Sequence, residues 1–345
     1  MGRLRVSGVT KRYGDVDVLR GIDFEMAEGS IVALLGSSGS GKTTLLRLIA
    51  GFADPDSGTI AIGDRQVAGP GVYVPTEKRH IGYVPQEGAL FPHLTVGQNI
   101  AFGLRWGRRD RVRIEEVLRI TGLTGYEDRY PHQLSGGQQQ RTALARALAP
   151  RPNIVLLDEP FNALDLDLRR VMAADVASAL RNAGATAILV THDPFEAFAS
   201  ADQVAAMTNG KIAQIGDPAA IYHDPLSARV ARLTGPAVFL DAIIEGTTAI
   251  TCVGRMPAAL REGVGPGPAQ VMLRPEQLTL SPSGDGPRGR VERIIFNGDH
   301  YLATVEIDGL SLPVRIAGEE LPEIGGSVAL STHGSCVAFA SPRKR

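Results

Sequence analysis

The sequence has very few cysteines and no long hydrophobic run. Its 345 residues include only two cysteines, Cys252 and Cys336, which lie far apart and lack metal-ligand spacing. We therefore expect ordinary thiols in a reducing compartment. No stretch approaches the roughly 20 apolar residues that cross a bilayer, and the first residues lack the apolar core of a signal peptide. We expect a protein at the cytoplasmic side, at most peripheral to a membrane.

The sequence also lacks an excess of charge of either sign. It contains 36 Lys and Arg residues against 37 Asp and Glu residues. This balance provides no overall attraction to the phosphates of nucleic acid, so we predict no nucleic-acid partner. No internal repeat of fixed period is evident, and the length is typical of two domains.

Short, fully apolar runs alternate with helical patterns in the first two-thirds of the chain. The runs are Ile31–Leu35, Ile81–Val84, Ile154–Leu157 and Ala187–Thr191. Such runs are typical of parallel strands buried on both faces. We predict an α/β domain over residues 1–235, whose ligands bind beyond the carboxyl ends of the strands.

After about Gly235 the pattern changes to short alternating segments separated by glycine and proline. Little helical periodicity is found there. The pattern is typical of small antiparallel barrels. We predict an all-β, OB-like domain over residues 236–345, with turns or loops at Gly263–Pro268 and Ser281–Pro287.

The segment GSSGSGKT, Gly36 to Thr43, lies between an apolar run and a helical pattern. It fits G-x-x-x-x-G-K-[ST], in which glycines let backbone N–H groups converge on phosphate oxygens. Lys42 would reach the β- and γ-phosphates, and the Thr43 hydroxyl would bind magnesium. A glycine-rich turn with an incidental lysine is the alternative, which the flanking strand and helix disfavour. The segment therefore predicts a P-loop NTPase.

Polar side chains follow the other apolar runs. In IVLLDEP we assign Asp158 to the magnesium ion and Glu159 to the attacking water as general base. Gln86 can contact magnesium or the water, and a ring nitrogen of His192 can bind a γ-phosphate oxygen. Singly, each could be a structural residue, but beside the phosphate loop they favour one catalytic site. The predicted catalytic residues are Lys42, Gln86, Glu159 and His192, and the predicted magnesium ligands are Thr43, Gln86 and Asp158.

A second phosphate-facing turn, LSGGQQQR, runs from Leu134 to Arg141 and opens another helical pattern. Ser135, Gly136 and Gly137 offer a hydroxyl, backbone N–H groups and the positive end of a helix to an anion. An ordinary serine N-cap explains the start of a helix but not two consecutive glycines.

Together these motifs resemble those of the ATP-binding subunits of ABC transporters, from roughly Leu4 to Thr234. The resemblance implies a helical subdomain and identifies Tyr13 as the residue that stacks on adenine. One departure is NALD, where the family most often has serine in place of Asn162; we interpret it as a variation in dimer contacts. The implied nucleotide-binding residues are Tyr13, Gly36, Ser37, Ser38, Gly39, Ser40, Gly41, Lys42, Thr43, Thr44, Ser135, Gly136, Gly137 and Gln138.

The resemblance also implies partners. Two copies would form a head-to-tail, ATP-dependent dimer in which Ser135 of one copy covers the γ-phosphate on the phosphate loop of the other. The apolar segment GALFPHLTVGQNIAFGLRW would contribute a groove for an integral membrane permease, which in turn works with an extracytoplasmic solute-binding protein.

The C-terminal domain resembles the regulatory extension of importers for oligosaccharides, polyamines and ferric ions. Segments such as TGPAVFLDA look most like those of ferric-ion importers. A polyamine, sugar or other small-solute importer stays open as an alternative. A soluble ABC ATPase without a permease is disfavoured, because the chain has one set of motifs and no sustained heptads.

Overall fold

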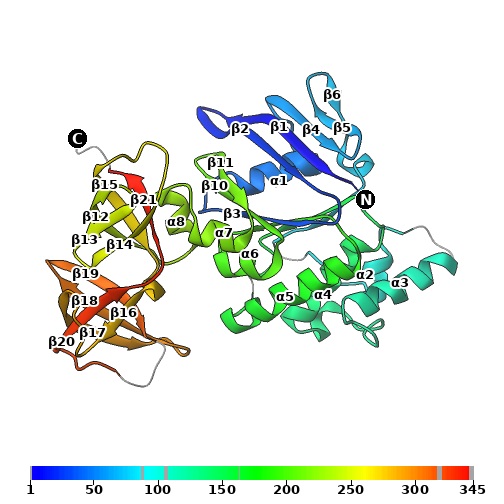
Figure 1. Cartoon of the computed structure of the whole chain (residues 1–345). Coiled ribbons are helices and arrows are strands. Elements are labelled where there is room, and N and C mark those ends of the chain that lie inside the picture. The colour runs from blue at the N-terminus through cyan, green and yellow to red at the C-terminus, as the bar shows by residue number, and fades with distance from the viewer. Residues whose placement is uncertain (1, 87–88, 105–107, 163, 317–320, 342–345) are drawn as a thin grey trace. The chain divides into compact units, whose positions relative to one another are not determined.

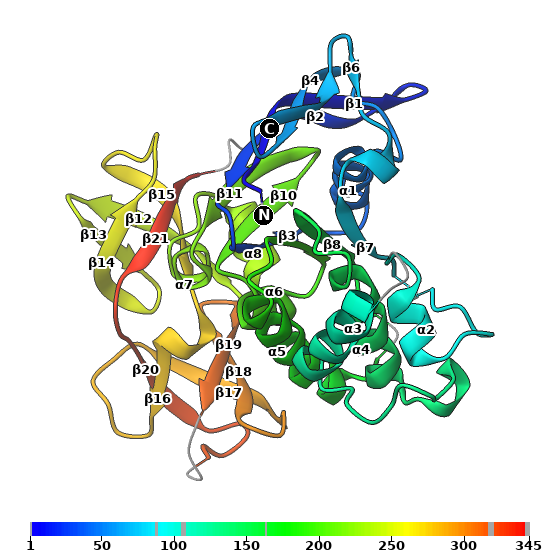
Figure 2. The ribbon, with the colours of Figure 1, turned by 90° about the vertical axis from the view of Figure 1, so that its right-hand side faces the viewer.

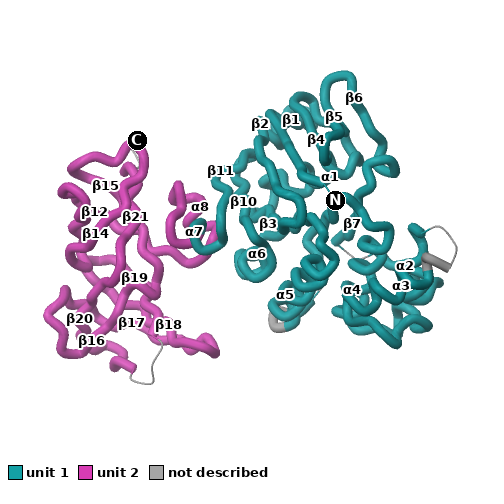
Figure 3. Tube along the Cα trace, turned by 45° about the vertical axis from the view of Figure 1, so that its right-hand side comes forward, with its two compact units in different colours: residues 1–221 teal, residues 222–345 magenta. Residues whose placement is uncertain are grey.

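The computed structural model describes residues 2–86, 89–104, 108–162, 164–316 and 321–341 (Figure 1). The chain divides into two compact units, residues 1–221 and 222–345 (Figure 3). This division lies between Ile221 and Tyr222, whereas the sequence pattern predicts a domain boundary near residue 235. Within the described ranges, no helix combines the length and the apolar character needed to cross a membrane.

Unit 1 is built around a six-stranded sheet with the order β11-β10-β3-β9-β8-β7. All its neighbouring strands run parallel except β11, which is antiparallel to β10. The four predicted apolar runs form four adjacent strands, which confirms the predicted α/β fold. The strands are β3 (Ile31–Leu35), β7 (Ile81–Val84), β8 (Ile154–Asp158), β9 (Ala187–Thr191), β10 (Gln203–Thr208) and β11 (Lys211–Gly216).

A second sheet of unit 1 is antiparallel and has the order β2-β1-β4-β5-β6. Helix α1 (Lys42–Ala50) buries Leu45, Leu46 and Leu48 in one apolar core with side chains of both sheets. The strands are β1 (Leu4–Tyr13), β2 (Val16–Met26), β4 (Ser57–Ile62), β5 (Arg65–Gly69) and β6 (Val72–Tyr73).

Helices α2, α3 and α4 gather at one end of unit 1 in both ribbon views, as expected for a helical subdomain (Figures 1 and 2). Helix α5 follows β8, and α6 follows β9. The helices are α2 (Val96–Ala101), α3 (Arg108–Ile120), α4 (Gly136–Leu148), α5 (Leu166–Asn182), α6 (Pro194–Ser200) and α7 (Pro218–His223).

Arg79 anchors the C-terminal end of α1. Its guanidinium is buried and donates to the carbonyl oxygens of Leu48 at 2.7 Å and Ile49 at 2.9 Å. The last turn of a helix leaves carbonyl oxygens without an N–H donor from the helix itself; here Leu48 also accepts from the Gly51 N–H at 3.2 Å, and Arg79 adds a side-chain donor to both carbonyls. Arg79 therefore fixes the helix that the phosphate loop opens.

Unit 2 begins at Tyr222, within the end of α7, contains helix α8 (Ala228–Thr234) and is otherwise rich in strands. A closed barrel contains β12 (Val238–Glu245), β13 (Thr248–Thr251), β14 (Gly254–Leu260), β21 (Cys336–Ala340) and β15 (Gly267–Leu273). A second sheet contains β16 (Leu278–Ser281), β20 (Ser327–Thr332), β17 (Arg288–Phe296), β18 (Tyr301–Ile307) and β19 (Leu310–Ile316). The predicted all-β domain is confirmed, and one apolar core spans the barrel and the sheet.

The barrel differs from the expected antiparallel arrangement in one pair of strands. Strand β21 pairs parallel with β14 and antiparallel with β15. The last strand thus returns, after the whole second sheet, to close the barrel.

Arg274 is buried at the end of β15 and ties the start of unit 2 together. Its guanidinium lies over the ring of Tyr222, 3.9 Å from the centroid, and donates to the Thr234 hydroxyl at 2.8 Å. It also donates to the carbonyl oxygens of Tyr222, Ala231, Gly235 and Pro236. One side chain therefore joins Tyr222, α8 and the barrel within unit 2.

Candidate functional site

The predicted phosphate loop connects β3 to α1, and Lys42 is buried beneath it. The Lys42 ammonium donates to the carbonyl oxygens of Gly36 at 2.8 Å and Ser37 at 3.1 Å. Burial lowers the pKa of Lys42, while the charges of Glu159 and Asp158 oppose that shift. Ser37, Ser38, Gly39 and Thr43 are exposed, Thr44 is half-buried, and the buried Ser40 hydroxyl has no hydrogen-bond partner within the described chain.

Two glycines of this loop leave no room for a side chain. A Cβ atom on Gly36 would lie 2.5 Å from the Ser40 oxygen and 2.7 Å from the Met207 carbonyl oxygen. Gly41 has a φ of 101°, and a Cβ there would lie 2.7 Å from Leu19. The loop thus requires glycine for both its path and its packing.

Asp158, at the end of β8, lies beside the start of α1. The Thr43 hydroxyl donates to one Asp158 carboxylate oxygen at 3.1 Å, and the Tyr83 hydroxyl donates to the other at 3.1 Å. Burial, reinforced by the charge of Asp158, raises the pKa of Tyr83, so this phenol stays a donor. A hydroxyl and a carboxylate in contact form an oxygen donor set that suits magnesium. Tyr83 was not predicted, although a polar group within the run IGYV is a local signal.

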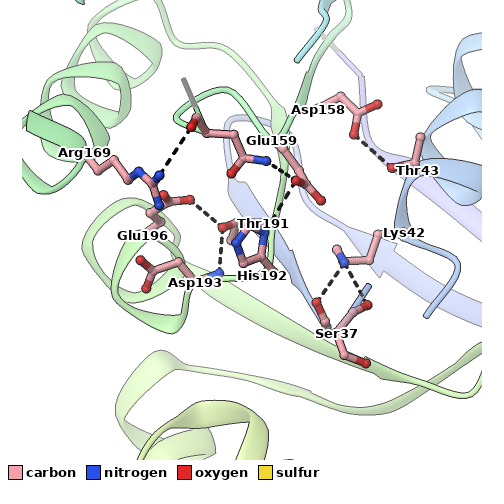
Figure 4. A network of polar contacts seen from close by, with 12 residues as sticks. Ser37, Lys42, Thr43, Asp158, Glu159, Arg169, Thr191, His192, Asp193 and Glu196 are labelled. Atoms are coloured by element: carbon pink, nitrogen blue, oxygen red, sulfur yellow. Dashed lines mark hydrogen bonds and ion pairs between the residues drawn. The ribbon is translucent and has the colours of Figure 1, made fainter. Parts of the chain in front are cut away.

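Glu159 and His192 follow adjacent strands and meet at the same edge of the sheet (Figure 4). His192 Nδ1 lies 3.5 Å from Glu159 Oε2, and the Asn162 amide donates to the same oxygen. Glu159 has a φ of 45°, a backbone conformation that residues with a side chain rarely adopt. Such strain clusters at functional sites.

A further group of polar side chains surrounds the His192 segment (Figure 4). The Thr191 hydroxyl donates to the buried carboxyl of Glu196 and accepts from the Asp193 N–H at 3.0 Å. Burial raises the pKa of Glu196, and Arg169 opposes this shift. Neither Glu196 nor Arg169 was predicted, because nothing in the local sequence marks them.

The turn at Ser135 forms the N-terminus of α4. The Ser135 oxygen accepts from the Gln138 N–H at 3.3 Å, and Gln138 Oε1 accepts from the Ser135 N–H at 3.0 Å. This reciprocal capping box uses the serine hydroxyl only as an acceptor, which leaves the hydroxyl proton for another group. Gln138 also donates to the Tyr126 hydroxyl at 3.1 Å.

The two glycines of this turn also have a packing role. A Cβ on Gly136 would lie 3.1 Å from Leu164, and one on Gly137 would lie 3.1 Å from the Met172 sulfur. The pair therefore allows α4 to approach the segment after Glu159 closely, so contact with an anion is not its only explanation.

Two predicted residues lie apart from this cluster. Tyr13 ends β1 with 47% of its surface exposed, and the Lys11 ammonium lies 5.4 Å from its ring centroid. Gln86 is exposed in the turn after β7, and no hydrogen bond joins it to the other site residues in the part of the chain that the structure describes. The same holds between Ser135, Gly136, Gly137 or Gln138 and the phosphate loop of the same chain.

The chain is similar to known proteins over almost its whole length. A family model described as ABC transporter matches residues 19–162, and one described as TOBE domain matches residues 271–339. "Fe(3+) ions import ATP-binding protein FbpC 1" of Rhodococcus jostii is 47% identical over 97% of this chain and 98% of its own length. A protein of similar name from Pseudomonas fluorescens is 45% identical over 97% of each chain.

A solved structure resembles the first part of the chain. It is the dimeric, post-hydrolysis state of the ATP-binding cassette MJ0796 bound to ADP and Pi, with 30% identity and a TM-score of 0.53. The match covers 62% of this chain and 98% of that one. The full-length relatives, the two domain matches and this structure lead to one assignment. The chain belongs to the ABC transporter family, as an ATP-hydrolysing subunit that carries a C-terminal TOBE domain.

Proposed function

We propose that this protein hydrolyses ATP between two copies of itself to drive the import of ferric ions through a membrane permease. One observation carries the catalytic part of the proposal: the ends of β8 and β9 bring Glu159 to 3.5 Å from His192, while Asp158 contacts Thr43 of the phosphate loop. The general base Glu159 and the γ-phosphate ligand His192 therefore lie at the same edge of the sheet as the two magnesium ligands.

In this site the phosphate loop and Lys42 hold the phosphates of ATP. The Lys42 ammonium, which donates to two loop carbonyls, exchanges them for phosphate oxygens that carry more negative charge. Thr43, Asp158 and Gln86 hold magnesium, which when bound neutralises phosphate charge. Tyr13 stacks on the adenine through the ring face that Lys11 does not cover.

Glu159 accepts a proton from the attacking water, and His192 contacts the γ-phosphate. His192 Nδ1 lies 3.5 Å from Glu159 Oε2, so both side chains can act on the same nucleotide. Gln86, in the turn after β7, contacts the water or the metal when the nucleotide is present.

The second half of each site comes from another copy of the chain, arranged head to tail. The Ser135 hydroxyl proton, which the capping box does not use, and the N–H groups of Gly136 and Gly137 then face the γ-phosphate. The dimeric state named for the related structure, with ADP and Pi bound, supports the pairing of two copies.

Transport requires integral membrane permease subunits. This protein binds to them peripherally, at the cytoplasmic face of the membrane. Phe52 and Phe102 are 48% and 63% exposed, and the rings of Phe91 and Phe102 lie 4.3 Å apart. The exposed Phe102 ring at the end of α2, paired with Phe91, suits a hydrophobic segment of a permease. The names of the relatives support ferric ion as the cargo, delivered by an extracytoplasmic binding protein.

The test is reconstitution of the full chain with its permease and binding protein in proteoliposomes. We expect ATP-dependent uptake of labelled ferric ion, and loss of both uptake and phosphate release with Glu159→Gln. Uptake of a polyamine or an oligosaccharide instead would overturn the iron assignment. Normal phosphate release by Glu159→Gln would overturn the role given to Glu159.

A further inference from the structure

We propose that Asn162 is a positioning residue that holds the Glu159 carboxylate beside His192, and that Arg169 fixes Asn162 for this role. The proposal rests on the proposed ATPase mechanism and extends it to a residue for which the sequence indicates only a dimer contact. In the structure the Asn162 amide is directed at a carboxylate of its own chain.

The contacts of Asn162 define this role. Its Nδ2 donates to Glu159 Oε2, the same oxygen that faces His192 Nδ1. Two groups on one oxygen fix the carboxylate plane and leave Oε1 to accept the proton of a water. The Asn162 N–H also donates to the Glu159 carbonyl oxygen at 3.3 Å, which closes a tight turn between the two residues.

The backbone of Glu159 alone does not determine where its side chain points. Its N–H donates to the Val190 carbonyl oxygen of β9 at 3.0 Å, which anchors the residue at the sheet edge with a φ of 45°. Beyond Cβ, however, the side chain rotates about single bonds, and 19% of its surface is exposed. The Asn162 amide supplies the restraint that the backbone lacks.

Arg169, from α5, holds Asn162 in turn. Its Nη2 donates to the Asn162 carbonyl oxygen at 3.3 Å, and its Nε donates to the Leu164 carbonyl oxygen at 2.8 Å. The charge of Arg169 also acts on the buried carboxyl of Glu196, which binds Thr191 beside His192. The planar guanidinium thus holds the segment after Glu159 by two hydrogen bonds (Figure 4).

Serine, which the resemblance implies at this position, cannot replace this contact without a shift of the backbone. A serine hydroxyl oxygen is bonded to Cβ directly, whereas the asparagine amide nitrogen lies one bond further out. Asparagine also supplies two N–H donors and serine one O–H. The identity of residue 162 in this chain therefore determines how firmly the carboxylate is held.

The decisive experiment separates a role in positioning from a role in dimer contacts. Phosphate release and ATP-dependent dimerisation are measured for the full chain carrying Asn162→Ala, alone and combined with Glu159→Gln. We expect Asn162→Ala to reduce kcat about tenfold or more, because the hydrogen bond that it removes is made to a charged group. KM for ATP should change little. Asn182→Ala, an exposed asparagine at the end of α5, is the control.

The double variant provides the discriminating result. If Asn162 acts through Glu159, the double variant still forms the ATP-bound dimer to the same extent as Glu159→Gln alone. Loss of that dimer would show a dimer contact and overturn the proposal.

Two other variants sharpen the test. Asn162→Asp keeps the shape but sets a like charge against Glu159, so it should lose more activity than Asn162→Ala. Arg169→Gln should lower kcat as Asn162→Ala does. If Asn162→Ala is fully active and Glu159→Gln is inactive, only the positioning role of Asn162 is refuted. If Glu159→Gln is active, the underlying ATPase mechanism is refuted.

Discussion

The Thr43 hydroxyl donates a hydrogen bond to Asp158 at 3.1 Å, although the two residues are 115 positions apart in the sequence. Their contact follows from the sheet, in which β3 and β8 both flank β9 and run parallel. The ends of these strands therefore meet at one edge, and the helix that starts after β3 brings Thr43 to the acid after β8.

Asp158→Asn should make ATP binding independent of magnesium. The amide keeps a neutral oxygen acceptor for Thr43 but loses the charge that attracts a divalent cation. Calorimetric titration with ATP, with and without magnesium, checks this prediction. Tyr83→Phe is the matched control, because it removes the other hydrogen bond of Asp158 but keeps the carboxylate; magnesium should still strengthen binding to that variant. An equal magnesium effect in Asp158→Asn and the unmodified protein would contradict the assignment.

Ser135→Arg should abolish hydrolysis while each monomer still binds ATP, because Ser135 makes no hydrogen bond to its own phosphate loop. Mixing it with Lys42→Ala provides the stronger test. In a head-to-tail pair, the intact phosphate loop of one variant meets the intact Ser135 turn of the other, so the mixture regains part of the phosphate release. Two inactive variants that stay inactive when mixed would argue against composite sites.

Glu196→Gln should stabilise the protein increasingly as the pH rises above about 4.5. Burial raises the pKa of the Glu196 carboxyl above its ordinary value of 4.5. The carboxyl therefore favours the folded state fully at acidic pH, and this contribution is lost as the pH rises through the folded-state pKa. Glutamine never ionises and avoids the loss. Denaturant unfolding across pH 4 to 8 checks the trend; a constant difference between the two proteins would contradict it.

Arg274→Met should lower the free energy of unfolding of unit 2 by about 3 kcal/mol or more, because it leaves several buried acceptors without a donor. The aliphatic part of methionine keeps much of the packing over Tyr222. Thermal and denaturant unfolding measure the effect. Arg288→Met, an exposed arginine of the same unit, should change little; similar losses in both variants would exclude a special role for Arg274.

The sequence allowed the main strands and several site residues to be predicted for the same physical reason. Strands buried on both faces are continuous apolar runs, and polar residues that follow them must lie at the sheet edge. Asp158, Glu159 and His192 were predicted in this way, whereas Thr43 was predicted from the phosphate-loop motif. The structure brings the four together in two contacting pairs.

The remaining features depend on contacts between distant segments. Arg169 and Glu196 have no local pattern, because their partners lie on other elements. Gly136 and Gly137 suggested an anion site, but their close packing against Leu164 and Met172 is visible only in three dimensions. The parallel pairing of β14 with β21 likewise joins segments separated by the whole second sheet.

The position of β21 affects how the protein folds during synthesis. All strands of unit 1 precede residue 221, so its sheets can form while the rest of the chain is still being made. The barrel of unit 2, in contrast, lacks the strand between β14 and β15 until Cys336–Ala340 has left the ribosome. Until then the edges of β14 and β15 stay unpaired. Chaperones that bind unpaired strand edges can therefore bind unit 2 for longer than unit 1.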